Sequence, residues 1–174
     1  MSKKLAENLY RLVLDVKFGS GAFMKTRKEA KQLAASMTKV GKLMGIKVSH
    51  LLSPMDEPLG RAVGNALEVA ECVEILHGSG PPDVVDLVLD LAEQVSTASR
   101  AKLARWLSDG TAWRKFISLA YAQYGTHRRW RKSLTCTAPI THPLLAYSAG
   151  TVKTMDAETI GRISFSRRRP PEGR

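Results

Sequence analysis

The sequence has few cysteines and no long apolar run. Its two cysteines, Cys72 and Cys136, form neither a CxxC pattern nor a pair with nearby histidines. The sequence therefore predicts neither a zinc site nor a disulfide framework, and we expect thiols in a reducing compartment. The apolar stretches fall far short of the roughly 20 residues that cross a bilayer, and no signal-peptide core follows Lys4. We expect a cytoplasmic protein without a membrane span.

Acidic residues are scarce in the last third of the chain. The whole sequence has 27 Lys and Arg against 16 Asp and Glu, a formal net charge of +11, and residues 111–174 hold 12 of the basic and 3 of the acidic residues. The basic runs at 127–132 and 167–169 could bind nucleic-acid phosphates. A solvated connector and a disordered tail explain the same excess, so nucleic acid is not the expected partner.

Apolar patterning in the first third of the chain predicts an α/β fold. With 44% hydrophobic and 25% charged residues, the 174-residue chain is long enough for one modest core. Residues 12–18 and 46–52 have the branched apolar composition of buried strands. Between them, Thr26 and Glu29 have the spacing of a capping box, and Gly45 marks the end of a helix. Strand, helix and strand in this order predict a parallel pair.

Further along, the spacing of apolar residues predicts mainly helices. One helix is expected from Pro58 to Gly78, with proline in its first turn. Others are expected over 84–95, over 99–107 and around Trp113. Residues 144–155 resemble a strand, a turn at Gly150 and a second strand.

Glycines directly follow the first predicted strand. A turn such as Gly19-Ser20-Gly21 can bring backbone N–H groups close to a phosphate. The spacing matches neither GxGxxG nor GxxxxGK[ST]. We therefore interpret Gly19 and Gly21 as residues of a tight turn.

Three ordered blocks resemble a known family. They are residues 2–6 (SKKLA), 12–24 (LVLDVKFGSGAFM) and 55–69 (MDEPLGRAVGNALEV). Together they resemble the thymidine phosphorylase and pyrimidine-nucleoside phosphorylase family, over residues 1 to about 95 and more faintly near 138–140 and 150–161. The chain resembles an N-terminally truncated member.

The resemblance implies an α/β fold that is the central part of the phosphorylase α/β domain. It implies a mixed sheet with flanking helices and a partial β-rich C-terminal remnant. The expected organisation is a remnant of the helical dimerisation domain at 1–8, the central α/β domain at 9–125, a basic connector at 126–137, a partial C-terminal domain at 138–165 and a disordered tail at 166–174.

The resemblance also implies a pentosyltransferase activity. Family members are homodimers that use inorganic phosphate as co-substrate to cleave thymidine or uridine into the free base and (deoxy)ribose 1-phosphate. In the family the phosphate-binding segment precedes the SKK block, so we expect this chain to be inactive alone. The alternative is a non-catalytic basic protein that binds nucleic acid or a full-length phosphorylase subunit.

Four site residues follow from the resemblance. Lys3 matches a lysine that contacts a carbonyl group of the pyrimidine base, although a solvated lysine near a chain start looks the same. Leu59, Ala62 and Glu71 match positions that bind potassium through two backbone carbonyls and one carboxylate, oxygen ligands suited to a hard cation. Glu71 is equally explained as a surface residue of an amphipathic helix. No catalytic acid or base is assigned.

Overall fold

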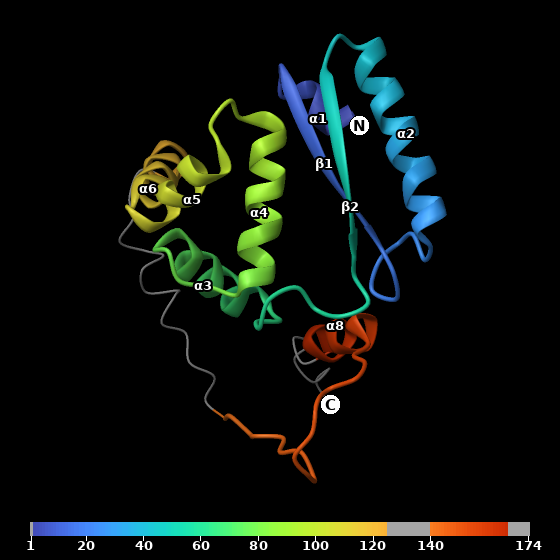
Figure 1. The fold of residues 1–174 in the computed structure, drawn as a ribbon, viewed down its shortest axis with the longest axis vertical. Helices are drawn as coiled ribbons and strands as arrows, with labels where there is room; N and C mark the ends of the chain where they lie inside the picture. Colours follow the sequence, from blue (N-terminus) through green and yellow to red (C-terminus); the bar gives the residue numbers. More distant parts are fainter. Residues whose placement is uncertain (1, 125–139, 167–174) are drawn as a thin grey trace, which may run out of the picture.

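The computed structural model describes residues 2–124 and 140–166 (Figure 1). A small sheet lies between one helix on one side and a group of helices on the other, and a C-terminal helix lies below the sheet. The elements are α1 (Ser2–Ala6), β1 (Arg11–Phe18), α2 (Arg27–Leu43), β2 (Lys47–Pro54), α3 (Asn65–Leu76), α4 (Pro82–Val95), α5 (Arg100–Ser108), α6 (Thr111–Tyr124) and α8 (Ala157–Ser166). The predicted α/β class is confirmed.

The two described strands are parallel. Arg11 of β1 pairs with Lys47 of β2, and the register continues to Phe18 and Pro54. The intervening α2 returns the chain to the start of the second strand, as a parallel connection requires. The predicted parallel pair is confirmed, whereas the antiparallel neighbours of a mixed sheet are not present among residues 2–124 and 140–166.

A capping box begins α2. The Glu29 backbone N–H donates to the Thr26 hydroxyl at 3.2 Å, and the Thr26 N–H donates to the Glu29 carboxylate at 3.0 Å. These hydrogen bonds from Thr26 hold the pKa of Glu29 below its ordinary value. The predicted helix start is therefore confirmed, and two otherwise unpaired N–H groups of the first turn are satisfied.

The core lies between α2 and one face of the sheet. Val16 is 4% exposed, and Ala30 and Ala34 are completely buried. The small alanine side chains let α2 approach the strands closely, and larger, partly buried side chains pack against this contact. These larger side chains are Leu14, Phe18, Met24, Met37 and Leu52.

The opposite face of the sheet carries a polar group. Lys17 lies 2.8 Å from the Asp15 carboxylate and donates to the Ser53 hydroxyl at 3.0 Å. The Ser53 hydroxyl in turn donates to Asp15, and Ser53 is 8% exposed. Helix α4 packs against β1, so these polar side chains are partly shielded from water. They meet their hydrogen-bonding needs by bonding to one another.

The helix predicted to start at Pro58 is wrong in its first turn. The helix α3 begins only at Asn65, and residues 58–64 form an irregular loop. Gly60 and Gly64 adopt φ angles of 73° and 126°, which a right-handed helix does not accommodate. The helix-like spacing of apolar residues thus extends into residues 58–64, although the backbone of this segment is not helical. This is why the predicted helix started too early.

The strand, turn and strand predicted at 144–155 are also wrong. Residues 140–155 have no helix or strand, and Leu144 and Tyr147 are fully exposed. A strand needs a hydrogen-bonding neighbour, and the structure gives this segment none among the residues it describes. The β-rich remnant is instead an extended segment followed by α8, while the predicted connector and residues 167–174 of the predicted tail lie outside the described residues.

Across residues 2–124 and 140–166, no helix is both long enough and apolar enough to cross a bilayer.

Candidate functional site

The turn after β1 is closed by a carboxylate. Gly19 adopts a φ of 121°, and a Cβ there would lie 2.7 Å from the Asp56 carboxylate. The backbone N–H of Ser20 donates to this carboxylate at 2.9 Å. An anion at this turn would meet the charge of Asp56 and compete for the same N–H group. The geometry therefore favours the tight-turn interpretation of Gly19 over a phosphate loop.

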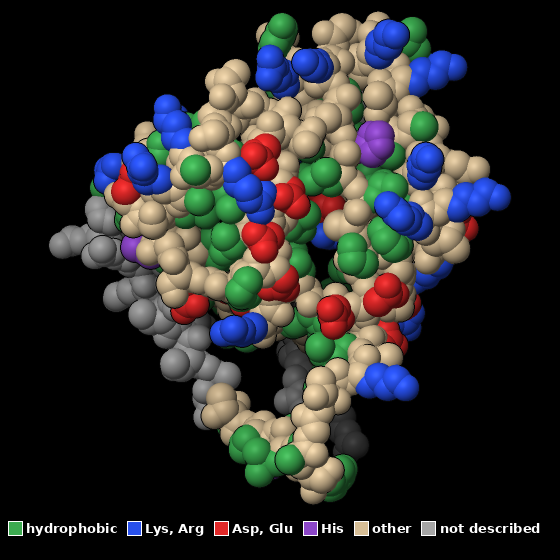
Figure 2. All heavy atoms as spheres, in the orientation of Figure 1, with side chains coloured by type: hydrophobic (Ala, Val, Ile, Leu, Met, Phe, Trp, Pro, Cys, Tyr) green, Lys and Arg blue, Asp and Glu red, His purple; other side chains and the backbone are tan. Residues whose placement is uncertain are grey.

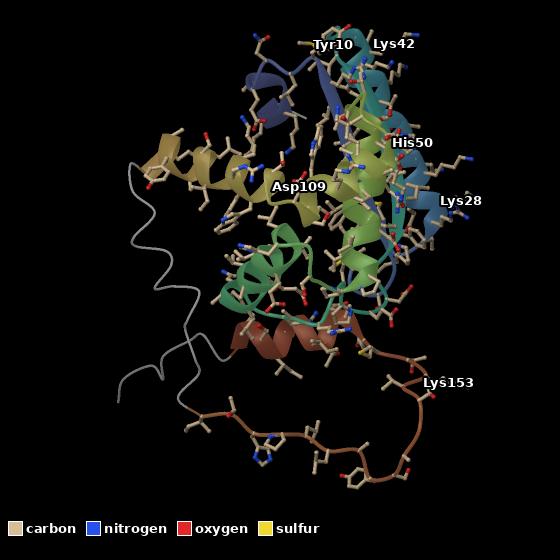
Figure 3. The ribbon with its side chains drawn as sticks, turned by 60° about the vertical axis from the view of Figure 1, so that its left-hand side comes forward. Tyr10, Lys28, Lys42, His50, Asp109 and Lys153 are labelled. Carbon is tan, nitrogen blue, oxygen red and sulfur yellow. The ribbon has the colours of Figure 1, made fainter. Side chains whose placement is uncertain are left out.

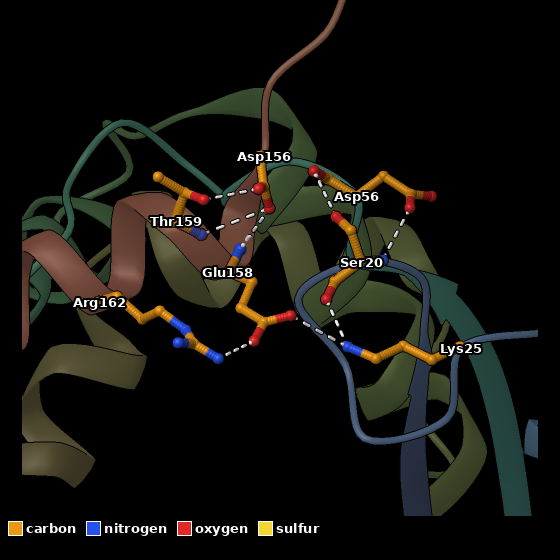
Figure 4. A network of polar contacts seen from close by, with 7 residues as sticks. All are labelled: Ser20, Lys25, Asp56, Asp156, Glu158, Thr159 and Arg162. Carbon is orange, nitrogen blue, oxygen red and sulfur yellow. Dashed lines mark hydrogen bonds and ion pairs between the residues drawn. The ribbon is translucent and has the colours of Figure 1, made fainter.

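Helix α8 docks on this turn through a network of polar contacts (Figure 4). The Ala157 N–H donates to the Asp56 carbonyl at 3.1 Å. Lys25 donates to the Ser20 carbonyl at 2.7 Å and lies 3.2 Å from the Glu158 carboxylate. Segments distant in the sequence thus meet at the carboxyl ends of the strands, the edge at which parallel α/β sheets usually bind ligands.

The loop at 59–62 is held by carboxylates from two helices. The Gly60 N–H donates to Asp83 of α4 at 2.8 Å, and the Arg61 N–H donates to Glu71 of α3 at 2.8 Å. At the end of the loop, the Gly64 N–H donates to Glu68 at 2.8 Å. These contacts hold the loop in its non-helical shape, since its amides are bonded to side chains instead of to a preceding turn.

The oxygens around this loop fit a hard cation. Glu71 uses Oε1 for the Arg61 N–H, whereas its Oε2 has no hydrogen-bond partner in the described part of the chain. The carbonyl oxygens of Leu59 and Ala62 likewise accept no hydrogen bond from a described residue. Carboxylate and backbone carbonyl oxygens are the ligands that potassium or another hard cation prefers. The structure places Glu71 against the loop at Arg61, which lies between Leu59 and Ala62 in the sequence, and the cation site at these three residues stays a prediction.

Lys3 lies far from the loop at 59–62. It is exposed on α1, and α1 lies near the amino end of β1 (Figure 1). Tyr10 marks this end in Figure 3, where Lys153 lies at the opposite end of the molecule. The loop at 59–62 follows the carboxyl end of β2. The described residues thus place Lys3 and the predicted cation ligands at opposite ends of the strands.

Two acidic residues of the site were missed by sequence reasoning. Asp83 holds Gly60, and Asp56 holds the turn at Gly19. The sequence around Asp83 offered a signal for a structural role, because Asp83 follows two prolines at the start of a helix, where a carboxylate is favoured. Asp56 had none, since its partner lies 36 residues away.

A cavity of about 610 Å³ opens beside the loop. Its wall combines the end of β2 and the following loop with one side of α4 and the extended C-terminal segment, and Figure 2 shows red carboxylates gathered over α4 beside a hollow. The charged lining side chains are Lys17, Asp56, Glu57, Asp83, Asp86, Asp90 and Lys153. The carboxylate majority makes this cavity unfavourable for phosphate.

Cys72 provides a chemical readout of Glu71. Desolvation raises the pKa of the Cys72 thiol, and the charges of Glu71 and Glu68 raise it further. Less thiolate is present at neutral pH, so alkylation is slow. In a Cys136→Ser background, Glu71→Gln should lower this pKa and speed iodoacetamide labelling at pH 7 by about two- to fourfold, the effect of one solvent-screened charge.

The matched control is Glu74→Gln, which removes another carboxylate from the same helix. It should leave the labelling rate unchanged. Equal rates for the Glu71→Gln variant and its parent would contradict an effect of the Glu71 charge on the pKa of the Cys72 thiol.

Comparisons with known proteins agree with the three sequence blocks. A family described as "Glycosyl transferase family, a/b domain" matches residues 1–112. The chain is 43% identical to the thymidine phosphorylase of Mycobacterium tuberculosis (strain H37Rv), over 98% of this chain and 40% of that protein. It is 42% identical to the pyrimidine-nucleoside phosphorylase of Staphylococcus aureus (strain NCTC 8325), over 72% of this chain and 31% of that protein.

These matches confirm the resemblance stated from sequence. They also establish that the chain spans well under half the length of these relatives. The match to the α/β domain covers every described element from α1 to α5 and the first residues of α6. The chain therefore belongs to the glycosyl transferase family that is defined by this α/β domain.

Proposed function

We propose that this chain is part of a pyrimidine-nucleoside phosphorylase, a pentosyltransferase. Inorganic phosphate would attack C1′ of thymidine or uridine, and the products would be the free base and (deoxy)ribose 1-phosphate. The observation that carries the proposal is the 43% identity to a thymidine phosphorylase over 98% of this chain. We further propose that the complete enzyme is a homodimer.

The reaction needs charge stabilisation at two ends of the sugar. The sugar becomes electron-poor at C1′ while phosphate approaches on one side and the base leaves with negative charge on the other. An ammonium group beside a base carbonyl stabilises that leaving charge, and no acid and base pair is required. We assign this role to Lys3, whose side chain is exposed and has no partner among the described residues.

The second proposed role is structural support by a bound cation. Leu59 and Ala62 would hold potassium through their carbonyl oxygens, and Glu71 would hold it through its carboxylate. A bound potassium ion would supply positive charge to a loop whose amides are bonded to the carboxylates of Asp83, Glu71 and Glu68. The carboxylates would then keep the loop ordered without repelling one another.

Phosphate is the co-substrate for which the described loops offer no favourable site. The Ser20 N–H is already bonded to Asp56, and the cavity beside β2 is lined mainly by carboxylates. We therefore propose that phosphate is held by the portion of the enzyme that these 174 residues do not match. Turnover by this chain alone is not expected, because the binding energy of the nucleophile would be missing.

The proposed function is tested first on the chain alone and then on a chimera that joins the chain to the rest of a thymidine phosphorylase. First, the purified chain is assayed for thymine and uracil release at saturating phosphate, and we expect no turnover. Next, the chain replaces its matching part in the M. tuberculosis thymidine phosphorylase. We expect the chimera to turn over, and Lys3→Ala to lower its kcat/KM by about 100-fold, the scale of losing one charge-stabilising group.

Lys4→Ala is the matched control, since Lys4 is the next residue and is equally exposed. It should leave kcat/KM of the chimera close to the parent value. A folded chimera that releases no base from either nucleoside would contradict the proposed function. Equal losses for the Lys3→Ala and Lys4→Ala chimeras would contradict the role given to Lys3.

A further inference from the structure

Part of the wall of the cavity beside β2 comes from the extended C-terminal segment. Its residues Lys153, Thr154 and Met155 line the cavity together with the strands, the loop after β2 and α4. Among the described residues, no hydrogen bond or ion pair joins these three residues to the rest of the lining. Their place beside the cavity therefore depends on what holds the neighbouring part of the chain.

The chain is fixed shortly after these three residues. The Ala157 N–H donates to the Asp56 carbonyl at 3.1 Å, and Asp56 also lines the cavity. Ala157 is buried, whereas Val152, which precedes the three residues, is exposed. The segment thus passes from solvent to a buried anchor at the start of α8, and the lining residues lie between these two points.

The turn after β1 is shaped for close packing with this anchor. The Gly21 N–H donates to the Met55 carbonyl at 2.9 Å, directly beside the Asp56 carbonyl that accepts from Ala157. A Cβ at Gly21 would lie 2.7 Å from the Ala157 Cβ and 2.9 Å from the Met55 carbonyl oxygen. Gly21 does not have a positive φ angle. Space for α8, rather than backbone conformation, is therefore what requires a glycine at this position.

Packing contributes more than charge to the docking of α8. Lys25 lies 3.2 Å from the Glu158 carboxylate (Figure 4), but both side chains are largely exposed, and an ion pair of that kind contributes little stability. Helix α8 has 10 residues, and isolated helices of this length are marginal in water. The contact at Gly21 therefore holds α8 in place and also supports its helical structure.

We propose that residues 153–155 are a strap that closes the cavity beside β2, and that docking of α8 at Gly21 holds this strap closed. Release of α8 frees the strap and opens the cavity to molecules from solvent, as a local opening that leaves the core intact. The similarity to the thymidine phosphorylase of M. tuberculosis covers 98% of this chain, so α8 belongs to the shared sequence. The inference rests on the contacts of α8 and not on the proposed activity.

The experiment measures how accessible the cavity is. Leu87 of α4 lines the cavity and is half-buried, whereas the next residue, Val88, does not line it and is exposed. Leu87→Cys and Val88→Cys are made separately in the full chain, in a background with Cys72→Ser and Cys136→Ser. The rate of iodoacetamide labelling at constant pH then reports opening of the strap at Leu87→Cys, and Val88→Cys is the matched control.

Two alanine variants should change this rate in opposite directions. Gly21→Ala creates the clash with Ala157 and should speed labelling of Leu87→Cys by about fivefold. Gly161→Ala lies within α8, where a Cβ would meet nothing within 4 Å. It should slow labelling of Leu87→Cys by about threefold, because alanine stabilises the helix that holds the strap. Circular dichroism checks that each variant remains folded.

Several results would overturn the proposal. Labelling of Leu87→Cys that neither alanine variant changes would show that α8 does not control access to the cavity. Equal changes at Val88→Cys would show a general loosening of the chain instead of a moving strap. A parent rate at Leu87→Cys equal to that of the urea-unfolded chain would show that the cavity stands open while α8 is docked.

Discussion

Replacing Gly60 with alanine is expected to destabilise the protein by about 3 kcal/mol, whereas the same replacement at Gly45 should cost about 1 kcal/mol. The two glycines have almost the same backbone conformation, with φ angles of 73° and 74°. A Cβ at Gly60 would lie 2.3 Å from Glu71 Oε2 and 2.9 Å from Val84 Cγ2, and one at Gly45 would meet nothing within 4 Å. The Gly45→Ala variant therefore reports the cost of backbone strain alone, and the Gly60→Ala variant reports the cost of strain together with a steric clash.

The measurement is urea unfolding of the full chain with and without potassium chloride, with sodium chloride at equal ionic strength as the salt control. In the parent and in Gly45→Ala, potassium should raise the free energy of unfolding. In Gly60→Ala this increment should disappear, because the new Cβ would displace the Glu71 carboxylate from the loop. Equal destabilisation of both variants would show that Glu71 does not approach Gly60.

Replacing Gly41 with alanine should destabilise the protein by about 2 kcal/mol, although alanine favours helices. Gly41 lies within α2, where exchange for alanine would ordinarily contribute about 1 kcal/mol to stability. A Cβ at this position would lie 2.1 Å from Val48 Cγ2 of β2. The steric clash outweighs the higher helix propensity of alanine, because α2 and β2 cannot move apart to relieve it without opening the core.

Shortening Val48 should relieve this collision. The double variant Gly41→Ala with Val48→Ala is expected to be more stable than the sum of the two single variants predicts, by about 2 kcal/mol of coupling. Urea unfolding of the parent, both single variants and the double variant measures this coupling. Strictly additive effects would show that Gly41 and Val48 are not in contact.

Local signals predicted the first part of the fold well. The capping box of Thr26 and Glu29 begins α2 as expected, and the apolar composition at 12–18 and 46–52 corresponds to β1 and β2. In these cases the determining contacts lie within a few residues of one another. The pattern of the sequence and the requirement for hydrogen bonding then lead to the same element.

The loop at residues 58–64 shows where local signals failed. Apolar spacing from Pro58 favoured a helix, but Gly60 and Arg61 donate their N–H groups to Asp83 and Glu71, which approach from other helices. The resemblance identified Leu59, Ala62 and Glu71 as a group, and the structure shows Glu71 bonded to the loop at Arg61. That Lys3 lies apart from this group was not predictable from spacing, because it depends on the direction of β1.

The sequence by itself determined the parallel strand pair, the helices around it and the family, because these depend on periodicity, capping and ordered motifs within short segments. The tertiary structure alone decided that residues 58–64 are a loop, that Asp56 closes the turn at Gly19 and that α8 docks on it. The physical reason is that residues distant in the sequence hold these backbone groups: Asp83 bonds to Gly60, Asp56 bonds to Ser20, and Ala157 of α8 bonds to the Asp56 carbonyl. Hydrogen bonds of that kind depend on packing between elements, which no local pattern encodes.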